Sequence, residues 1–168
     1  TVRTVKPTAL TLKKTETFYK GAAKGEEKSD YTNNYKANGT GIDTVTTYFY
    51  YTSGDGFASA SDANADSYMT RSNTERYSDS STKQISYYTG TESGEEATAW
   101  SQEYNYNGSS VKTTTIYEYT GDVLNKTTAF RDSTVRTVRP TGLTLKKTET
   151  IYQGAAKGEE KSDYTNNY

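Results

Sequence analysis

A 35-residue segment occurs twice in this chain, and this duplication constrains its fold more than any other feature. Thr1–Tyr35 and Thr134–Tyr168 are identical at 31 of 35 positions, at a constant offset of 133 residues. The four differences are conservative: Lys6 against Arg139, Ala9 against Gly142, Phe18 against Ile151, and Lys20 against Gln153. We interpret the sequence as one full period of a tandem array followed by the first 35 residues of the next period.

A shorter repeat lies inside the long one. Residues 1–9 would end a preceding repeat, and residues 10–41, 42–80, 81–110 and 111–142 form four units, with residues 143–168 starting the next period. Each unit opens with a Thr-rich run that ends in Tyr and is followed within a few residues by Gly. The aligned tyrosines are Tyr19, Tyr51, Tyr88, Tyr119 and Tyr152. Strand-length runs of β-branched and aromatic residues followed by Gly predict one β-hairpin per unit.

The composition favours strands over disorder. Leu, Ile, Val and Phe together number only 20 of 168 residues, a level at which disorder is usually suspected. Disordered chains, however, also have high net charge and few aromatic residues. This chain has a net charge of −1, 17 Tyr and 31 Thr, and Thr and Tyr favour half-exposed strands.

The expected fold is therefore all-β: stacked β-hairpin repeats in a solenoid-like, open-ended array that forms a filament. A single meander of eight strands per period would advance by about 38 Å, and hairpins divided between two sheets by about 19 Å. We favour the two-sheet arrangement, because it stacks the aligned tyrosines into a ladder. In this ladder we expect Tyr19, Tyr88, Tyr119 and Tyr152 to be at least half buried and in contact with the equivalent ring of an adjacent unit, with Tyr51 displaced by the extra residue before Gly54. A helix over residues 20–30 is the weaker alternative, since Gly21 and Gly25 interrupt it.

Several functional classes lose their usual residues. With no His and no Cys, the chain has no His-based acid–base site, no thiol nucleophile and no His/Cys zinc site. The adjacent carboxylates Glu95 and Glu96 fall in an expected turn, whereas glycosidase chemistry needs carboxylates that face each other. The balanced charge argues against nucleic acid, and no apolar run approaches the about 20 residues that span a bilayer. We expect no enzyme and no catalytic residues.

The stretch "YEYTGDVLNKTTAF" (Tyr117–Phe130) resembles the YD-repeat proteins of the rearrangement-hotspot type. The similarity rests on Tyr117, Tyr119, Gly121, Leu124 and Thr127, with Thr120 at the position of the family's aspartate. A looser similarity is to the Tyr/Thr-rich hairpin arrays of very large bacterial surface proteins. Both resemblances imply strings of hairpins in an extracellular or cell-surface setting and no catalytic residues.

Three groups of residues are candidate sites. Asp62, Asn64 and Asp66 place oxygen ligands at alternate positions, as at the start of a calcium loop, although a solvated loop tip is the simpler interpretation. Trp100, with Tyr104 and Tyr106, could form a sugar-binding face or could anchor one layer of the core. The third group, possible glycosylation sites in Asn-x-Ser/Thr triplets, comprises Asn38, Asn107 and Asn125.

Taken together, these features predict a structural protein: a repeat segment of an extracellular filament or stalk whose partner is a further copy of the same repeat. The alternative is a surface adhesin or glycan-binding module that uses the long loop and Trp100. A binding module would concentrate irregular features in one unit, whereas here only residues 57–66 break the pattern.

Overall fold

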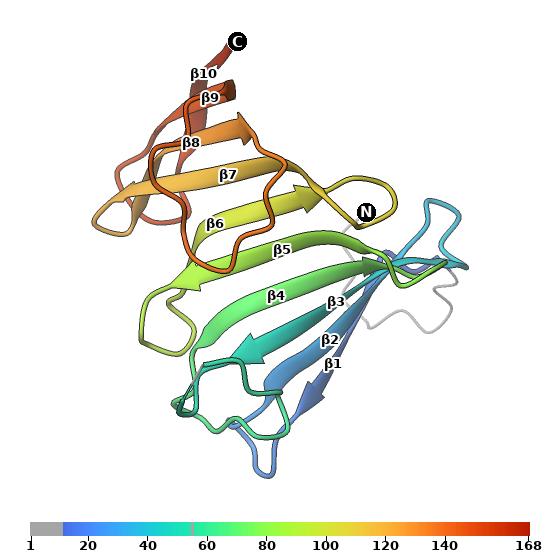
Figure 1. The fold of residues 1–168 in the computed structure, drawn as a ribbon. Coiled ribbons are helices and arrows are strands. Elements are labelled where there is room, and N and C mark those ends of the chain that lie inside the picture. The colour runs from blue at the N-terminus through green and yellow to red at the C-terminus, as the bar shows by residue number, and fades with distance from the viewer. Residues whose placement is uncertain (1–11, 55) are drawn as a thin grey trace, which may run out of the picture.

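The computed structural model describes residues 12–54 and 56–168, which fold into ten β-strands (Figure 1). The strands are β1 (Thr15–Lys20), β2 (Lys28–Tyr35), β3 (Ile42–Tyr50), β4 (Met69–Arg76), β5 (Thr82–Thr89), β6 (Ala97–Tyr104), β7 (Val111–Thr120), β8 (Val123–Arg131), β9 (Lys146–Gln153) and β10 (Lys161–Asn167). No helix occurs in the described part of the chain, so the all-β expectation is confirmed. The helical alternative over residues 20–30 is wrong: these residues form the end of β1, a turn and the start of β2.

All ten strands belong to one antiparallel sheet in the order of the sequence, β1 to β10. The preference for two separate sheets is therefore wrong, and the single meander holds. Each connection joins neighbouring strands, so none of the described strands belongs to a second sheet. Strands β3, β5 and β7 begin at Ile42, Thr82 and Val111, within one residue of the unit boundaries drawn from the sequence. One 133-residue period therefore spans the eight strands β1–β8.

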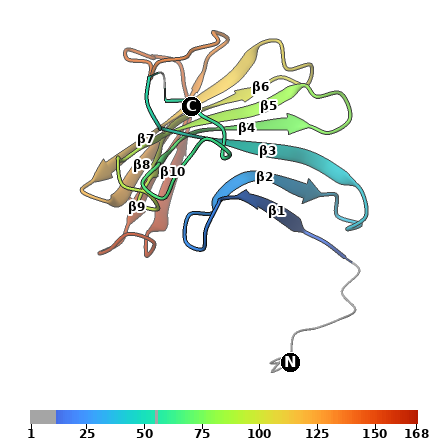
Figure 2. The same cartoon turned by 90° about the horizontal axis from the view of Figure 1, so that it is seen from below.

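Every pair of neighbouring strands contains a register shift. In β1–β2, for example, the shift lies between Phe18 and Tyr19, and in β7–β8 it lies between Glu118 and Tyr119. Such bulges increase the local right-handed twist of a sheet. The result is a strongly coiled ribbon, as the view from below shows (Figure 2).

The two faces of the sheet differ in chemistry because successive residues of a strand point to opposite sides. On one face, which we call the hydroxyl face, small hydroxyl residues form rows across neighbouring strands. One row runs through Thr17, Thr32, Thr46 and Thr74, and another through Ser72, Ser86, Ser101 and Thr115. Direct bonds join the Oγ1 atoms of Thr17 and Thr32 (2.8 Å) and of Thr46 and Thr74 (2.9 Å). In the second row, Ser72 Oγ bonds the Tyr88 hydroxyl and Ser86 Oγ accepts a bond from Gln84 Nε2, so these buried hydroxyls also have partners.

Asn-Gly is a turn signal in a sequence, and the pairs Asn38-Gly39 and Asn107-Gly108 each lie in a loop that is longer than two residues. Residues 36–41 and 105–110 close them, through bonds from the backbone N–H of Lys36 to Gly41 O and of Asn105 to Ser110 O. Gly39 and Gly108 have φ angles of 70° and 69°. A Cβ at Gly39 would lie 2.7 Å from Leu12 Cα, so both the backbone angle and the space require glycine.

A single sheet leaves most of its surface in water, and the core lies where other parts of the chain cross the sheet. One such place is at the end of β3, where Ala58 of the following loop pairs with Tyr50 and where Tyr50 and Ala60 are buried. The other is at β5–β7, where the side chains of Tyr87, Trp100, Tyr104 and Val111 are buried. The segment that crosses this second place is the candidate site.

Candidate functional site: a strap at the repeat junction

Residues 132–145, here called the strap, leave the sheet after β8 and return to it at β9. Instead of turning tightly, the strap crosses the face of the sheet over β7, β6 and β5 (Figure 1, the orange loop). We call this the strap face; it is opposite the hydroxyl face and carries Tyr87, Trp100, Gln102 and Thr114. The strap begins with Asp132, whose carboxylate accepts a hydrogen bond from the backbone N–H of Thr134 (3.1 Å).

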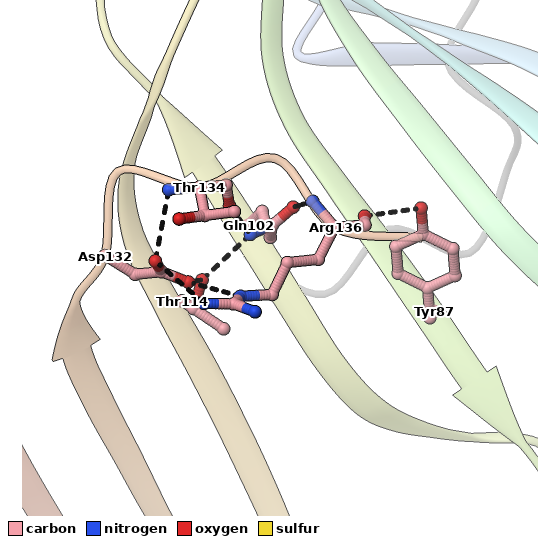
Figure 3. A network of polar contacts seen from close by, with 6 residues as sticks. All are labelled: Tyr87, Gln102, Thr114, Asp132, Thr134 and Arg136. Carbon is pink, nitrogen blue, oxygen red and sulfur yellow. Dashed lines mark hydrogen bonds and ion pairs between the residues drawn. The ribbon is translucent and has the colours of Figure 1, made fainter. Parts of the chain in front are cut away.

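Gln102 binds the strap as a neighbouring strand would. Its Nε2 donates to the Thr134 carbonyl (2.9 Å) and to Thr114 Oγ1 (3.0 Å), and its Oε1 accepts the backbone N–H of Arg136 (2.9 Å) (Figure 3). The side chain is 0 % exposed, and each of its polar atoms is bonded. An amide buried this deeply would be costly without these partners, so the strap and Gln102 stabilise each other.

Asp132 completes the network. Its carboxylate accepts hydrogen bonds from Arg136 Nε and from Thr114 Oγ1, both at 2.9 Å. Burial alone would raise the pKa of Asp132, but the hydrogen bonds from Arg136, the backbone N–H of Thr134 and Thr114 outweigh it and hold the pKa below its ordinary value. The strap is therefore closed by an ionised carboxylate between pH 5 and neutrality.

An aromatic pair supports the far end of the strap. The rings of Tyr87 and Trp100 stack with centroids 4.1 Å apart and an angle of 5° between their planes. The Tyr87 hydroxyl also lies 3.4 Å from the carbonyl of Arg136, to which it donates (Figure 3). Trp100 is 3 % exposed. Its interpretation as part of a sugar-binding face is therefore wrong: Trp100 is a core anchor, and of the proposed trio only Tyr106 is on the surface, 77 % exposed.

The strap coincides with the junction between repeats. Thr134, which accepts from Gln102, is the first residue of the second copy of the 35-residue segment. Its counterpart in the first copy, Thr1, lies outside the described residues. The start of the second copy of the 35-residue segment is thus bound to β6.

The described parts of the two copies have the same structure. β1 pairs with β2 from Thr15↔Asn34 to Lys20↔Lys28, and β9 pairs with β10 from Thr148↔Asn167 to Gln153↔Lys161, each register offset by 133 with the bulge at the same place. The contacts repeat as well: Lys13 binds Glu16 at 2.7 Å, and Lys146 binds Glu149 at 2.6 Å. The expectation that both copies adopt one conformation is confirmed for these residues.

The aligned tyrosines do not form a ladder of touching rings. Tyr19, Tyr88, Tyr119 and Tyr152 lie on β1, β5, β7 and β9, so at least one strand separates any two of them, and Tyr51 follows β3. Three hydroxyls instead contact the preceding strand: Tyr88 reaches Ser72 Oγ (3.1 Å), Tyr119 reaches Thr98 O (2.9 Å) and Tyr152 reaches Thr127 Oγ1 (3.5 Å). Tyr51 stacks on Tyr68, and Tyr19 on the edge strand is 60 % exposed.

The possible calcium ligands form an internally bonded turn. Asn64 Oδ1 accepts the backbone N–H groups of Asp66 (3.0 Å) and Ser67 (3.1 Å), and Asp62 Oδ2 accepts the Ser59 hydroxyl (2.6 Å). Within residues 12–54 and 56–168, no group of three or more Asp and Glu side chains converges on a point. Asn64 therefore acts as a turn-forming residue here.

The three possible glycosylation sites are exposed. The Oδ1 atoms of Asn38 and Asn107 accept the backbone N–H groups of Thr40 and Ser109, two residues on. Asn125 donates its Nδ2 to Thr120 Oγ1 (2.9 Å) across the β7–β8 turn. Glycosylation at these residues stays a prediction.

The residues that hold the strap were not candidates from the sequence. Gln102, Thr114 and Asp132 have neighbours that look like any strand or strand end. The one usable signal was the 14-residue length of the stretch from Asp132 to Leu145, much longer than an antiparallel connection needs.

No protein-family model, curated protein or solved structure matches the chain. In the described residues, no helix is long and apolar enough to cross a membrane.

Proposed function

We propose that the chain is a structural segment of an extracellular filament or stalk, in which a period of 133 residues repeats within one continuous β-sheet. The observation that carries this proposal is the identity of β1–β2 and β9–β10 in register, bulge and ion pair. The second hairpin stands in the same sheet as the first, eight strands further on. A following period can therefore add to β10 in the way that β3 adds to β2.

Each period would be held to the next by both the sheet and the strap. Sheet hydrogen bonds run along the ribbon, and the strap fixes the first residues of the second copy of the 35-residue segment to β5 and β6. Stability then grows as a sum of neighbouring interfaces, as it does in other repeat proteins. Extension in length with unchanged local structure is the property that a stalk requires. The glycan-binding alternative loses its main support, because Trp100 is buried.

Small-angle X-ray scattering of chains of increasing length tests this function. The chains would be residues 1–168 alone, and the same residues followed by one or two further copies of residues 36–168. We expect the longest dimension to rise by the same increment for each added period, up to about 38 Å for eight strands at about 4.8 Å each. Growth of a compact particle, with a smaller increment for each further period, would contradict the proposal.

A further inference from the structure

The outer edge of β10 is an unused copy of an edge that is paired elsewhere in the same molecule. Residues 28–35 and 161–168 have the same sequence. In β2, Tyr31 to Tyr35 pair with β3, whereas β10 pairs only with β9 among the described strands, and all its residues are exposed. β2 and β10 therefore have the same residues and differ only in whether a second strand pairs with them.

The side chains of β2 identify what an occupant of β10 must provide. Lys28 Nζ donates to Ala65 O (2.8 Å) and Ser93 Oγ (2.6 Å), and Ser29 O accepts the Tyr50 hydroxyl (2.8 Å). All three partners lie between β3 and the β5–β6 turn. The counterparts Lys161 and Ser162 make none of these bonds in the described structure. The segment that fits this edge is therefore β3 with the loops that follow it.

The first hairpin, β1–β2, likewise lacks contacts that its second copy, β9–β10, makes. In the second copy, Glu160 Oε1 accepts the backbone N–H of Leu124 (3.0 Å), and Lys157 Nζ donates to Glu95 O (3.0 Å), so the hairpin contacts β8 and the β5–β6 turn. Their counterparts Glu27 and Lys24 have no such strand beside them among the described residues, because β1 is an edge. The first hairpin thus carries an unused contact set for β8.

We propose that two copies of this chain join by hairpin exchange, in which β9–β10 of one copy replaces β1–β2 of the other beside β3. This inference rests on the proposed function, because it uses the same β2–β3 type of junction to continue the sheet. The donor hairpin keeps its pairing with its own β8, so the joined ribbon reads β8, β9, β10 and then β3 of the second copy. Two separate chains then reproduce the 133-residue period.

The exchange leaves the contacts at the junction unchanged. None of the four differences between the copies falls in residues 21–35, so β10 presents to β3 the same residues as β2. Exchange of an identical element between copies is a low-cost route to association. The intact chain opposes it through the high effective concentration of its own hairpin, which the 36–41 turn ties to β3. Exchange should therefore increase with protein concentration and with weakening of that turn.

Single cysteines report the exchange, because the chain has none of its own. In β2, Asn33 lies opposite Val45, and the Tyr35 N–H bonds Lys14 of β1. N–H groups two residues apart in a strand point the same way, so the Asn33 N–H also faces β1. Asn33 therefore makes no backbone hydrogen bond to β3, and Asn33 and Val45 form a non-hydrogen-bonded pair. Such a pair is close enough for a disulfide. The counterpart of Asn33 in β10 is Asn166.

The experiment mixes 168-residue Asn166→Cys and Val45→Cys chains, allows them to oxidise, and measures disulfide-linked heterodimer by mass. The control mixes Asn166→Cys with Glu16→Cys chains, because Glu16 is in β1 and would meet β10 only if two intact sheet edges came together. We expect the yield of the Asn166–Val45 heterodimer to be at least about ten-fold higher than the yield of this control heterodimer. Equal yields, or no Asn166–Val45 product, would overturn the proposal. Circular dichroism of each variant checks that it is folded.

Gly39→Val in the Val45→Cys chain provides the second test. Valine at φ 70° strains the 36–41 turn, so it should loosen β1–β2 and raise the crosslink several-fold. An unchanged yield would show that the crosslink forms without release of the hairpin, which contradicts exchange. The scattering series separates the two proposals: if long chains extend regularly and no crosslink forms, exchange alone fails.

Discussion

Replacing Trp100 with alanine is expected to lower the free energy of unfolding by about 3–5 kcal/mol. Trp100 is 3 % exposed and stacks on Tyr87, which in turn contacts the strap. In a single sheet few side chains are buried this completely, so the loss has little packing to compensate it. Urea unfolding followed by circular dichroism measures the change.

Tyr106→Ala is the matched control for Trp100→Ala. Tyr106 is 77 % exposed and contacts the Arg76 guanidinium over its ring, so its loss should cost less than about 1 kcal/mol. Equal effects of the two substitutions would mean that the strap does not cover a core. A Trp100→Ala protein of undiminished stability that lost binding to a glycan would instead favour the adhesin alternative.

Stability should fall steeply at alkaline pH, because buried tyrosines hold their protons. Burial is the largest cause and raises the pKa of Tyr50 to about 12, from 10.0. It also raises the pKa of Tyr87, Tyr88, Tyr104 and Tyr119. For a group whose pKa is higher in the folded state, the stabilisation is complete below the unfolded pKa and is lost as pH rises through the folded value. The loss should therefore begin near pH 10.

For Tyr50 alone, a pKa raised to about 12 corresponds to about 2–3 kcal/mol of stability lost between about pH 10 and pH 12. Chemical unfolding at a series of pH values, with phenolate absorbance recorded in parallel, measures both quantities. Tyr50→Phe removes the titrating hydroxyl, so its stability should decline less steeply over this range even though it loses the bond to Ser29 O. A profile that stays flat to pH 12 in the parent chain would contradict the burial of these rings.

The strands were predictable because their signals are local. Runs such as "TTTIYEYT" favour strands, and Asn38-Gly39 and Asn107-Gly108 supply a backbone that the turns need. The mistaken two-sheet arrangement and tyrosine ladder both concern pairing between units, which depends on contacts distant in sequence. Alignment placed Tyr88 over Tyr119, but β6 lies between their strands and accepts the Tyr119 hydroxyl.

The strap could not be predicted for the same reason. Gln102 lies in β6, whose sequence ATAWSQEY mixes small, polar and aromatic residues and does not mark Gln102 as a buried position. Its burial follows only from the return of residues 134–136, more than 30 positions later in the chain. The strap mixes polar residues with a few Val and Leu residues and contains Pro140 and Gly142, which suggest a loop and not a cover for a sheet.

Continuation of one sheet across the repeat junction is the central claim, and amide hydrogen exchange at β10 tests it most directly. The Tyr168 N–H donates to Lys147 O of β9. Because successive N–H groups of a strand point to opposite sides, those of Thr165 and Asn167 point away from β9, to the free edge of β10. A ¹⁵N-labelled copy of residues 1–168, ligated to an unlabelled copy of residues 36–168, allows these two amides to be followed by NMR. In the 168-residue chain they should exchange freely, and in the longer chain they should be protected as strongly as Thr32 and Asn34 of β2. Free exchange at Thr165 and Asn167 in the longer, folded chain would contradict the continuous sheet.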